Sequence, residues 1–364
     1  MTVSAYDAII PITVMSIAGH EGVDLMRGIA RLAKELGIST GTVSRALNGR
    51  ADVSEKTREL VLATAKRLGY APNQAARTLA LGTTRSVGFM MDLDRETAAS
   101  SEYFFMGVFD GAQSVLTANG FDLLVLPRPT NTNSLEFLKR YVNRGVFDGM
   151  ILAATQRVDP RIELLESAGV PFATLGRSTS GVNYPWIDLD FEAVATASID
   201  RLVNAGHRRI AVTIPSDNVN FGPIFLAAYR AALERHGIAF DPSLVFATGR
   251  NESAGYQLVD SLDALENKPT AILLIFETVA IGIYRRMAEL GRKPGQDLAI
   301  IGFRDEPTVR FLTPTLTCFG ASLHEIGEDL ARAVLSRIQA DGGSPDEDVF
   351  RKLAPLTMRP GESG

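Results

Sequence analysis

The sequence contains a single cysteine, which excludes a framework of internal disulfides. Cys318 stands alone among 364 residues, so the chain has no CxxC pair for a structural metal site. Such cysteine usage fits a reducing compartment such as the cytoplasm. The four histidines also lack the spacing of metal ligands, and we expect no metal site. They are His20, His207, His236 and His324.

Short motifs of catalysis and nucleotide binding are missing as well. The chain has no G-x-S-x-G elbow, G-x-G-x-x-G fingerprint, Walker A loop or H-E-x-x-H motif. Two acid pairs, Asp92 with Asp94 and Asp188 with Asp190, end expected strands, where carboxylates commonly cap loops. We therefore expect a protein that is not an enzyme and uses no cofactor.

Long apolar runs are absent near the N-terminus. The apolar stretch from Ala8 to Ala18 is well short of the roughly twenty residues of a membrane helix. No lysine or arginine precedes Arg27, so a secretory signal is not indicated either. We expect residues 1–25 to be disordered or to precede the true start, and the protein to be cytoplasmic with no membrane partner.

Positive charge is scarce overall but concentrated in one segment. The net charge is −5, yet residues 27–85 hold eleven Lys or Arg against four Asp or Glu, which gives +7 there and −12 elsewhere. A basic module on an acidic body is typical of a protein that binds a polyanion with one end. The same pattern also fits a solvated helical face, so charge alone leaves both interpretations open.

Two helices joined by a glycine turn are expected in this basic segment. Apolar side chains at positions 29, 32, 33 and 36 recur at helical spacing. Gly37 permits the positive φ of a turn, and Ser39 is a good N-cap for a second, short helix. Its expected inward side chains are Val43, Ala46 and Leu47, and its expected outer ones are Thr40, Gly41, Thr42, Ser44 and Arg45.

A third helix, 54–70, should start at the N-cap Ser54 and complete a helix-turn-helix module. Its expected inward side chains are Leu60, Val61, Thr64 and Leu68. Short hydroxyls on the second helix can donate to DNA phosphates, and Arg45 can bond guanine with two hydrogen bonds. The alternative is a three-helix domain that serves only as a structural cap.

The motif GISTGTVSRALN (37–48), followed by VSEKTR (53–58) and LGYAPN (68–73), resembles the LacI/GalR family of bacterial transcription repressors. The resemblance runs from about Gly28 to Pro360, and its N-terminal part is the more specific. It implies a homodimer that binds double-stranded, pseudo-palindromic operator DNA and responds to a small-molecule effector. Two-fold symmetry doubles the base pairs that one short helix can read.

The resemblance also implies DNA-contacting residues. Thr40 and Gly41 match the specificity positions of the recognition helix, and Arg45 matches its base-contacting arginine. In the hinge, Leu79 matches a leucine that wedges into the minor groove. The remaining expected contacts are Ser39, Thr42, Ser44, Asn48, Asn73, Ala76 and Arg77. The alternative for the hinge is a linker that never becomes ordered.

After residue 85, apolar segments of strand length alternate with helical ones. This pattern is typical of parallel sheets covered on both faces, and about ten βα units favour two doubly wound lobes over one sheet. The expected fold is an α/β core of two parallel-sheet lobes, similar to periplasmic binding proteins, behind an N-terminal all-α helix-turn-helix domain. The expected strands are 86–91, 121–127, 147–154, 170–176, 209–215, 244–247, 270–276, 297–303, 316–319 and 348–356.

The same pattern divides the chain. We expect an extension at 1–25, a DNA-binding domain at 26–71, a hinge at 72–84 and an effector-binding core at 85–360. Within the core, the expected N-lobe is 85–185 with 319–343, and the expected C-lobe is 186–318 with 344–360. Ligands of such folds bind beyond the carboxyl ends of the strands, so a cleft between the lobes is expected.

Several positions match pocket positions of the family, and their aromatic faces suit the C–H faces of sugars. The expected effector-binding residues are Phe104, Phe105, Arg177, Trp186, Asn220, Phe225, Phe276, Glu277 and Arg304. Three of them depart from the polar groups usual in sugar-responsive members, namely Phe225, Phe276 and Arg304. Any of the aromatic residues could instead belong to the core.

The departures leave two effector classes open. Arg304 and Arg177 could pair with an anionic ligand such as a sugar acid. Alternatively, Arg304 pairs with Glu277 or Asp305 and shapes a pocket for a neutral sugar, which the aromatic residues favour. We expect a repressor of carbohydrate-utilisation genes that a sugar releases from its operator. The alternatives are a pure small-molecule receptor, a corepressor-dependent regulator, and an enzyme on a doubly wound fold.

Overall fold

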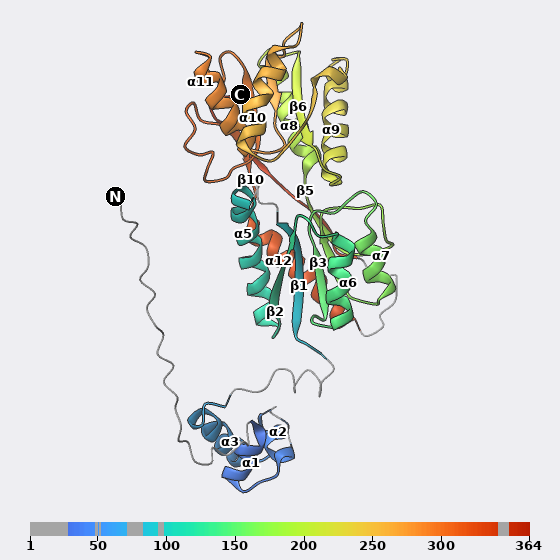
Figure 1. Ribbon diagram of the computed structural model, residues 1–364, viewed down its shortest axis with the longest axis vertical. Helices are drawn as coiled ribbons and strands as arrows, with labels where there is room; N and C mark the ends of the chain where they lie inside the picture. The colour runs from blue at the N-terminus through green and yellow to red at the C-terminus, as the bar shows by residue number, and fades with distance from the viewer. Residues whose placement is uncertain (1–27, 48–49, 51, 71–82, 94–97, 341–348) are drawn as a thin grey trace, which may run out of the picture. The chain divides into compact units, whose positions relative to one another are not determined.

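The computed structural model describes residues 28–47, 50, 52–70, 83–93, 98–340 and 349–364 (Figure 1). The chain forms two compact units, one ending at Gly82 and the other beginning at Thr83. Among the described residues, no helix is both long and apolar enough to cross a membrane.

The first unit is a three-helix module with a small apolar core. Its helices are α1 Ile29–Leu36, α2 Thr40–Leu47 and α3 Glu55–Arg67. Gly37 ends α1 with φ 63°, the left-handed conformation that the turn requires. The Ser39 hydroxyl accepts the Thr42 N–H at 3.0 Å, and Ser54 caps α3 in the same way. The two caps and the turn expected from the sequence are therefore present.

The core of this module contains most of the side chains expected there. Leu32, Val43 and Val61 have at most 1% of their surface exposed. The exception is Leu60, which was expected inside but is 55% exposed. Its neighbour Val61 faces the core together with Thr64 and Ala65, because residues three and four apart share one helix face. The expected inward register of α3 was thus wrong by one position at Leu60.

The second unit contains two α/β lobes, and the N-lobe sheet is entirely parallel. Its strand order is β11-β5-β4-β3-β1-β2. The strands are β1 Ser86–Leu93, β2 Asp122–Pro129, β3 Gly149–Leu152, β4 Phe172–Leu175, β5 Trp186–Leu189 and β11 Arg351–Ala354. The helices are α5 Ala98–Ala118, α6 Ser134–Arg144, α7 Pro160–Ser167 and α12 Leu323–Gln339. Helix α5 packs on α12, and α6 on α7 (Figure 1).

The C-lobe repeats this plan with strand order β12-β10-β9-β8-β6-β7. Its strands are β6 Ile210–Pro215, β7 Val245–Thr248, β8 Ala271–Leu273, β9 Ala299–Arg304, β10 Thr317–Gly320 and β12 Thr357–Arg359. Its helices are α8 Phe191–Asn204, α9 Phe221–Arg235, α10 Glu252–Asp263 and α11 Thr278–Glu289, with the 3₁₀ turn η1 Pro242–Leu244. Strand β12 pairs antiparallel to β10 at the sheet edge, and the sequence pattern did not predict this strand.

The fold class is confirmed, but the lobe boundaries differ from those expected. Strand β5 was assigned to the C-lobe, yet it pairs with β4 in the N-lobe sheet. Strand β11 was also assigned to the C-lobe, yet it pairs with β5. Conversely, β10 continues to Gly320 within the C-lobe sheet. The chain therefore crosses between lobes after β5, after β10 and after β11. Local periodicity identifies strands but not their partners, which explains the error.

Candidate DNA-binding surface and effector pocket

The second helix of the first unit presents a small, polar outer face. Ser39, Thr40, Gly41 and Arg45 are exposed, whereas Thr42 and Ser44 are partly buried. Val43 and Ala46 hold the opposite face in the core. The six candidates of this helix thus lie outside its buried face, as the periodicity predicted. The other expected DNA contacts, Asn48, Asn73, Ala76, Arg77 and Leu79, lie outside the described residues.

Arg45 forms an ion pair on this surface. Its Nε lies 3.2 Å from a carboxylate oxygen of Asp52, and both side chains are at least half exposed. Exposed pairs of this kind contribute little to stability, so DNA can replace the carboxylate at small cost. The pair orients Arg45 without burying it.

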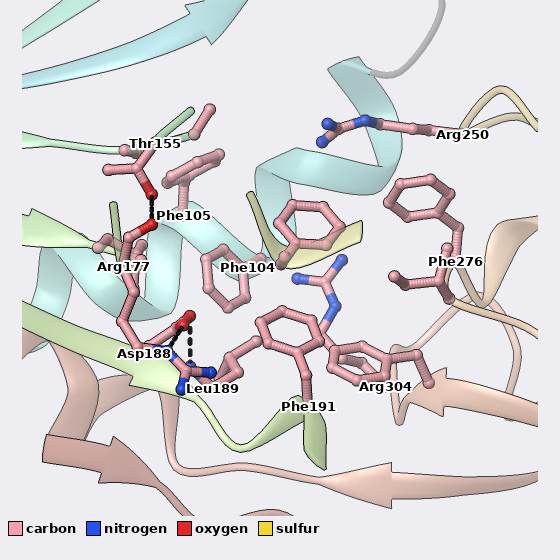
Figure 2. A pocket seen from close by; sticks show the side chains of 17 residues that line it. Phe104, Phe105, Thr155, Arg177, Asp188, Leu189, Phe191, Arg250, Phe276 and Arg304 are labelled. Atoms are coloured by element: carbon pink, nitrogen blue, oxygen red, sulfur yellow. Dashed lines mark hydrogen bonds and ion pairs between the residues drawn. The ribbon is translucent and has the colours of Figure 1, made fainter. Parts of the chain in front are cut away.

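A cavity in the second unit is lined by residues of both lobes, near the carboxyl ends of their strands (Figure 2). From the N-lobe, helix α5 contributes Phe104 and Phe105, the loop after β3 contributes Thr155, and the loop after β4 contributes Arg177. Strand β5 contributes Asp188. This position agrees with the cleft expected for doubly wound lobes.

The C-lobe wall of the cavity is built mainly of phenylalanine. Phe191 stacks on Phe221 and on Phe303, with ring centroids 5.0 Å apart in both pairs and planes within 5° and 7° of parallel. Phe276 meets Phe221 edge to face at 6.1 Å. With Phe104 and Phe105, six phenylalanine side chains line this cavity. The sequence reasoning missed Phe191, Phe221 and Phe303, because each follows a different crossover or strand.

Arg304 is held in the wall between two buried carboxylates. Its Nη2 lies 2.8 Å from Oε1 of Glu277 and 2.8 Å from Oε1 of Glu306. Its guanidinium also stacks on the ring of Phe104 at 4.6 Å. Burial raises the pKa of Glu306 to about 8, against the attraction of Arg304 and aided by the nearby Glu277. The expected Arg304–Glu277 pair is present, whereas Asp305 bonds Arg310 and Arg359 instead.

Arg177 is also committed to carboxylates, at the opposite side of the cavity. Its Nε donates to Asp188 at 2.7 Å, and its two Nη atoms donate to Glu192 at 2.8 and 2.9 Å. Burial raises the pKa of Asp188 to about 6, although Arg177 opposes the shift. This two-sided pairing uses three of the five N–H groups of the guanidinium.

Arg250 is a lining residue that the sequence reasoning did not identify. It follows β7, and its guanidinium lies 4.9 Å above the ring of Phe276 and 5.7 Å above that of Phe221. Its Nη2 donates to Asp217 at 2.6 Å. Each of the arginines that line the cavity, Arg177, Arg250 and Arg304, therefore has a carboxylate partner.

Two parts of the chain match known families. Residues 26–73 match the bacterial regulatory proteins of the lacI family, and residues 199–363 match the periplasmic binding protein-like domain. The chain is 30% identical over 336 residues to the HTH-type transcriptional regulator AglR of Rhizobium meliloti (strain 1021), which covers 91% of this chain and 93% of AglR. This chain belongs to the LacI family.

Other similar proteins agree with this assignment. The HTH-type transcriptional regulator CelR of Thermobifida fusca is 30% identical over 316 residues, covering 85% of this chain and 91% of CelR. The structure of a transcriptional regulator CelR–cellobiose complex matches with a TM-score of 0.69 and 26% identity, over 93% of this chain and 100% of that one. The Lac repressor dimer bound to operator and the anti-inducer ONPF has the same fold, with a TM-score of 0.79 and 22% identity, over 93% and 98% of the two chains.

This LacI-family chain is a ligand-responsive, DNA-binding transcription regulator. Of the nine residues expected to bind its effector, five line the cavity: Phe104, Phe105, Arg177, Phe276 and Arg304. The other four lie elsewhere, each for a specific structural reason. They are Trp186, Asn220, Phe225 and Glu277.

Two of these four are aromatic residues that support the cavity from behind. Phe225 is fully buried in helix α9, where it packs edge to face on Phe191 and Phe303. Trp186 stands at the start of β5, away from the strand's carboxyl end, and packs in the core between β3 and helices α6 and α7. Arg177 lies 5.7 Å above the Trp186 ring. Glu277, the third, is 1% exposed beneath Arg304.

Asn220, the fourth, joins the two lobes instead of lining the cavity. Its side-chain amide donates to the carbonyl of Arg177 at 2.7 Å, and its backbone N–H donates to the carbonyl of Thr155 at 2.8 Å. Beside it, Gln156 and Val219 form an antiparallel bridge across the same boundary. The lobes are thus connected directly at the edge of the cavity.

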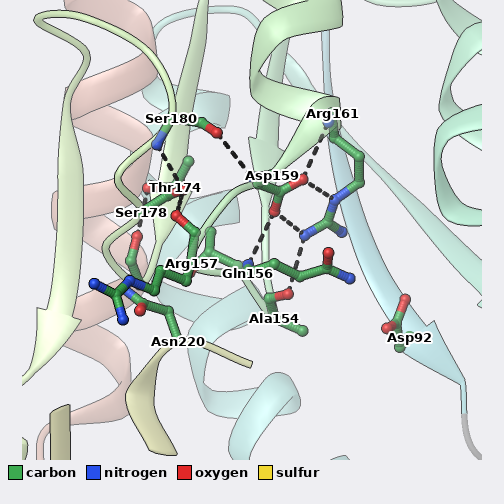
Figure 3. A network of polar contacts seen from close by, with 12 residues as sticks. Asp92, Ala154, Gln156, Arg157, Asp159, Arg161, Thr174, Ser178, Ser180 and Asn220 are labelled. Atoms are coloured by element: carbon green, nitrogen blue, oxygen red, sulfur yellow. Dashed lines mark hydrogen bonds and ion pairs between the residues drawn. The ribbon is translucent and has the colours of Figure 1, made fainter. Parts of the chain in front are cut away.

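A buried ion pair stiffens the N-lobe half of this connection (Figure 3). Asp159 accepts from Nε and Nη2 of Arg161 at 2.9 and 2.7 Å, and both side chains are almost fully buried. Asp159 also accepts the Gln156 N–H at 3.1 Å, and Arg161 donates to the Ala154 carbonyl at 3.0 Å. Because these bonds are buried, they fix the loop that carries Thr155.

The acidic and histidine residues considered earlier have structural partners. Asp92 pairs with Arg128 at 2.7 Å, Asp190 caps α8 by accepting the Ala193 N–H, and His207 contacts the Thr270 hydroxyl at 2.8 Å. Asp94 lies outside the described residues. Within the described part of the chain, no group of three or more His, Cys, Asp or Glu side chains could hold a metal ion.

Proposed function

We propose that the protein is a repressor of carbohydrate-utilisation genes that binds a palindromic operator as a homodimer and is released by a neutral sugar. The outer face of α2 would read the major groove, with Arg45 as the base-contacting residue. Relatives support this proposal, since one similar structure is a complex with cellobiose and another is a dimer on operator DNA.

The observation that carries the choice of a neutral effector is the pairing of the cavity arginines. An anionic ligand needs a cation that has no carboxylate already attached. Arg177, Arg250 and Arg304 each contact at least one carboxylate within 2.8 Å. Displacing a buried carboxylate such as Glu277 would leave an uncompensated charge, which is strongly unfavourable. A sugar acid is therefore disfavoured.

The proposal includes the absence of catalytic activity. The lining carboxylate Asp188 bonds Arg177 and the backbone of Leu189, a holding role with no adjacent nucleophile among the lining residues. The relatives reported above are transcription regulators, which agrees with this interpretation.

Fluorescence anisotropy tests the proposal directly. A labelled DNA fragment from the region upstream of the gene is titrated with full-length protein at two salt concentrations, with and without a panel of neutral sugars and sugar acids. We expect tight, salt-sensitive binding that a neutral sugar releases. Release only by a sugar acid would overturn the neutral effector, and tighter binding with ligand would show a corepressor.

A further inference from the structure

The effector cavity is chemically asymmetric. Its N-lobe side presents Thr155, Arg177 and Asp188, whose oxygen and nitrogen atoms can bond hydroxyl groups (Figure 2). Its C-lobe side presents Phe191, Phe221, Phe276 and Phe303. A ligand that spans the cavity must therefore be polar at one end and apolar at the other.

The polar side can hold one sugar ring. Asp188 accepts one hydrogen bond on each oxygen, from Arg177 and from the Leu189 N–H, and a carboxylate can accept more. Arg177 retains N–H donors beyond those used on Asp188 and Glu192. A carboxylate acceptor beside a guanidinium donor matches two neighbouring hydroxyls, one donating and one accepting.

The apolar side cannot serve a second sugar ring in the same way. The stacked rings of Phe221, Phe191 and Phe303 offer faces and edges but no hydrogen-bonding atoms. The nearby cations Arg250 and Arg304 are already bonded to Asp217, Glu277 and Glu306. Hydroxyls buried there without partners would weaken binding, whereas an apolar ring would gain stacking and burial.

We propose that the effector is a neutral glycoside with an apolar, ring-shaped aglycone. Its sugar binds Thr155, Arg177 and Asp188, and its aglycone lies against Phe191, Phe221 and Phe276. This inference rests on the proposed sugar response and adds the second half of the ligand. The family of compounds that fits this chemistry is the aryl glycosides, in which a phenol-type ring replaces a second sugar.

Matched ligands test the inference with the full-length protein. Isothermal titration calorimetry compares the phenyl glycoside, the methyl glycoside and the free sugar of glucose and of galactose, in both anomeric forms, together with phenol and cellobiose. We expect a phenyl glycoside to bind at least about tenfold more tightly than the methyl glycoside of the same sugar, because burial of the ring adds apolar contact. It should also release operator DNA.

Variants connect this gain to the phenylalanine wall. Phe276→Asn should reduce the advantage of phenyl over methyl glycosides to less than about threefold, because an amide replaces a stacking surface. Phe276→Leu should retain part of the advantage and shows whether a milder change keeps the protein folded. Phe350→Asn is the matched control, since Phe350 is 37% exposed and does not line the cavity. It should leave the preference unchanged.

The outcomes separate the two proposals. Equal affinity for phenyl and methyl glycosides, with the sugars releasing DNA, would overturn the aglycone while the sugar-responsive repressor stands. Preference for cellobiose over every phenyl glycoside would also overturn it. Binding of phenol as tight as that of its glycoside would overturn the sugar response instead. A phenyl preference that persists in Phe276→Asn would place the aglycone elsewhere and overturn the assignment to this wall.

Discussion

Asn220 of helix α9 donates its side-chain amide to the carbonyl of Arg177 across the lobe boundary, at 2.7 Å. Arg177 lines the cavity and also holds Asp188, so the connection between lobes and the polar side of the cavity share one residue. Any movement of the lobes must break this bond or move Arg177. Closure of the lobes and binding of the effector are therefore physically linked.

Asn220→Ala should weaken binding of the releasing effector by about three- to tenfold, because one interlobe hydrogen bond and its buried acceptor are lost. Calorimetry with the ligand that the anisotropy screen identifies would measure this change. Asn204→Ala, at an exposed position at the end of α8, is the control and should bind the effector normally. An unchanged effector affinity in Asn220→Ala would contradict a role in closure.

Arg45→Ala should abolish operator preference and leave weak nonspecific binding. Arg45 is the long donor on the outer face of α2, and a bidentate base contact contributes about 1–3 kcal/mol of discrimination. Anisotropy with operator and scrambled DNA measures the ratio of affinities. Arg31→Ala, on exposed α1 surface, should weaken both DNAs similarly. Equal operator affinity in Arg45→Ala and the parent protein would disprove the base contact.

Leu79→Ala should weaken operator binding without changing effector affinity. Leu79 lies outside the described residues, so the prediction depends on its match to the minor-groove leucine of the family. Operator affinity and effector affinity are measured separately on the same preparation. A parallel loss of both affinities would argue against a role restricted to the hinge.

Stability should fall as the pH rises toward 8. The pKa of Glu306 is about 8 in the folded protein, above its ordinary value of 4.5, so the folded state holds this proton more tightly than the unfolded chain. Its contribution is therefore full below about pH 4.5 and is lost as the pH rises to about 8. The raised pKa of Asp188 acts in the same direction over a lower range, ending near pH 6.

Thermal melts between pH 5 and 9 would measure this dependence. Glu306→Gln, which resembles the protonated acid, should flatten the decline by several degrees because its side chain cannot ionise. Glu266→Gln, on an exposed loop, should leave the decline as it is in the parent. A Glu306→Gln protein with the parent's pH profile would show that Glu306 is already ionised when folded.

Much of the architecture could be predicted because its signals are local. Gly37, Ser39 and the apolar spacing before them define the helix-turn-helix within about a dozen residues. The alternation of apolar strands and helices likewise defines each βα unit. The lobe boundaries were less predictable, because the pairing of β5 with β4, and of β11 with β5, joins segments that sequence periodicity treats as independent.

The sequence by itself determined the family, the polar outer face of α2 and the two-lobed α/β class, since these depend on spacing within short segments. Only the tertiary structure decided which side chains line the cavity. Phe191 and Phe303 lie more than a hundred positions apart in the chain, yet their rings stack at 5.0 Å. The partners of Arg304 and Arg177 were decided in the same way, because a charge interacts with whatever the fold brings within a few ångströms, regardless of its place in the chain.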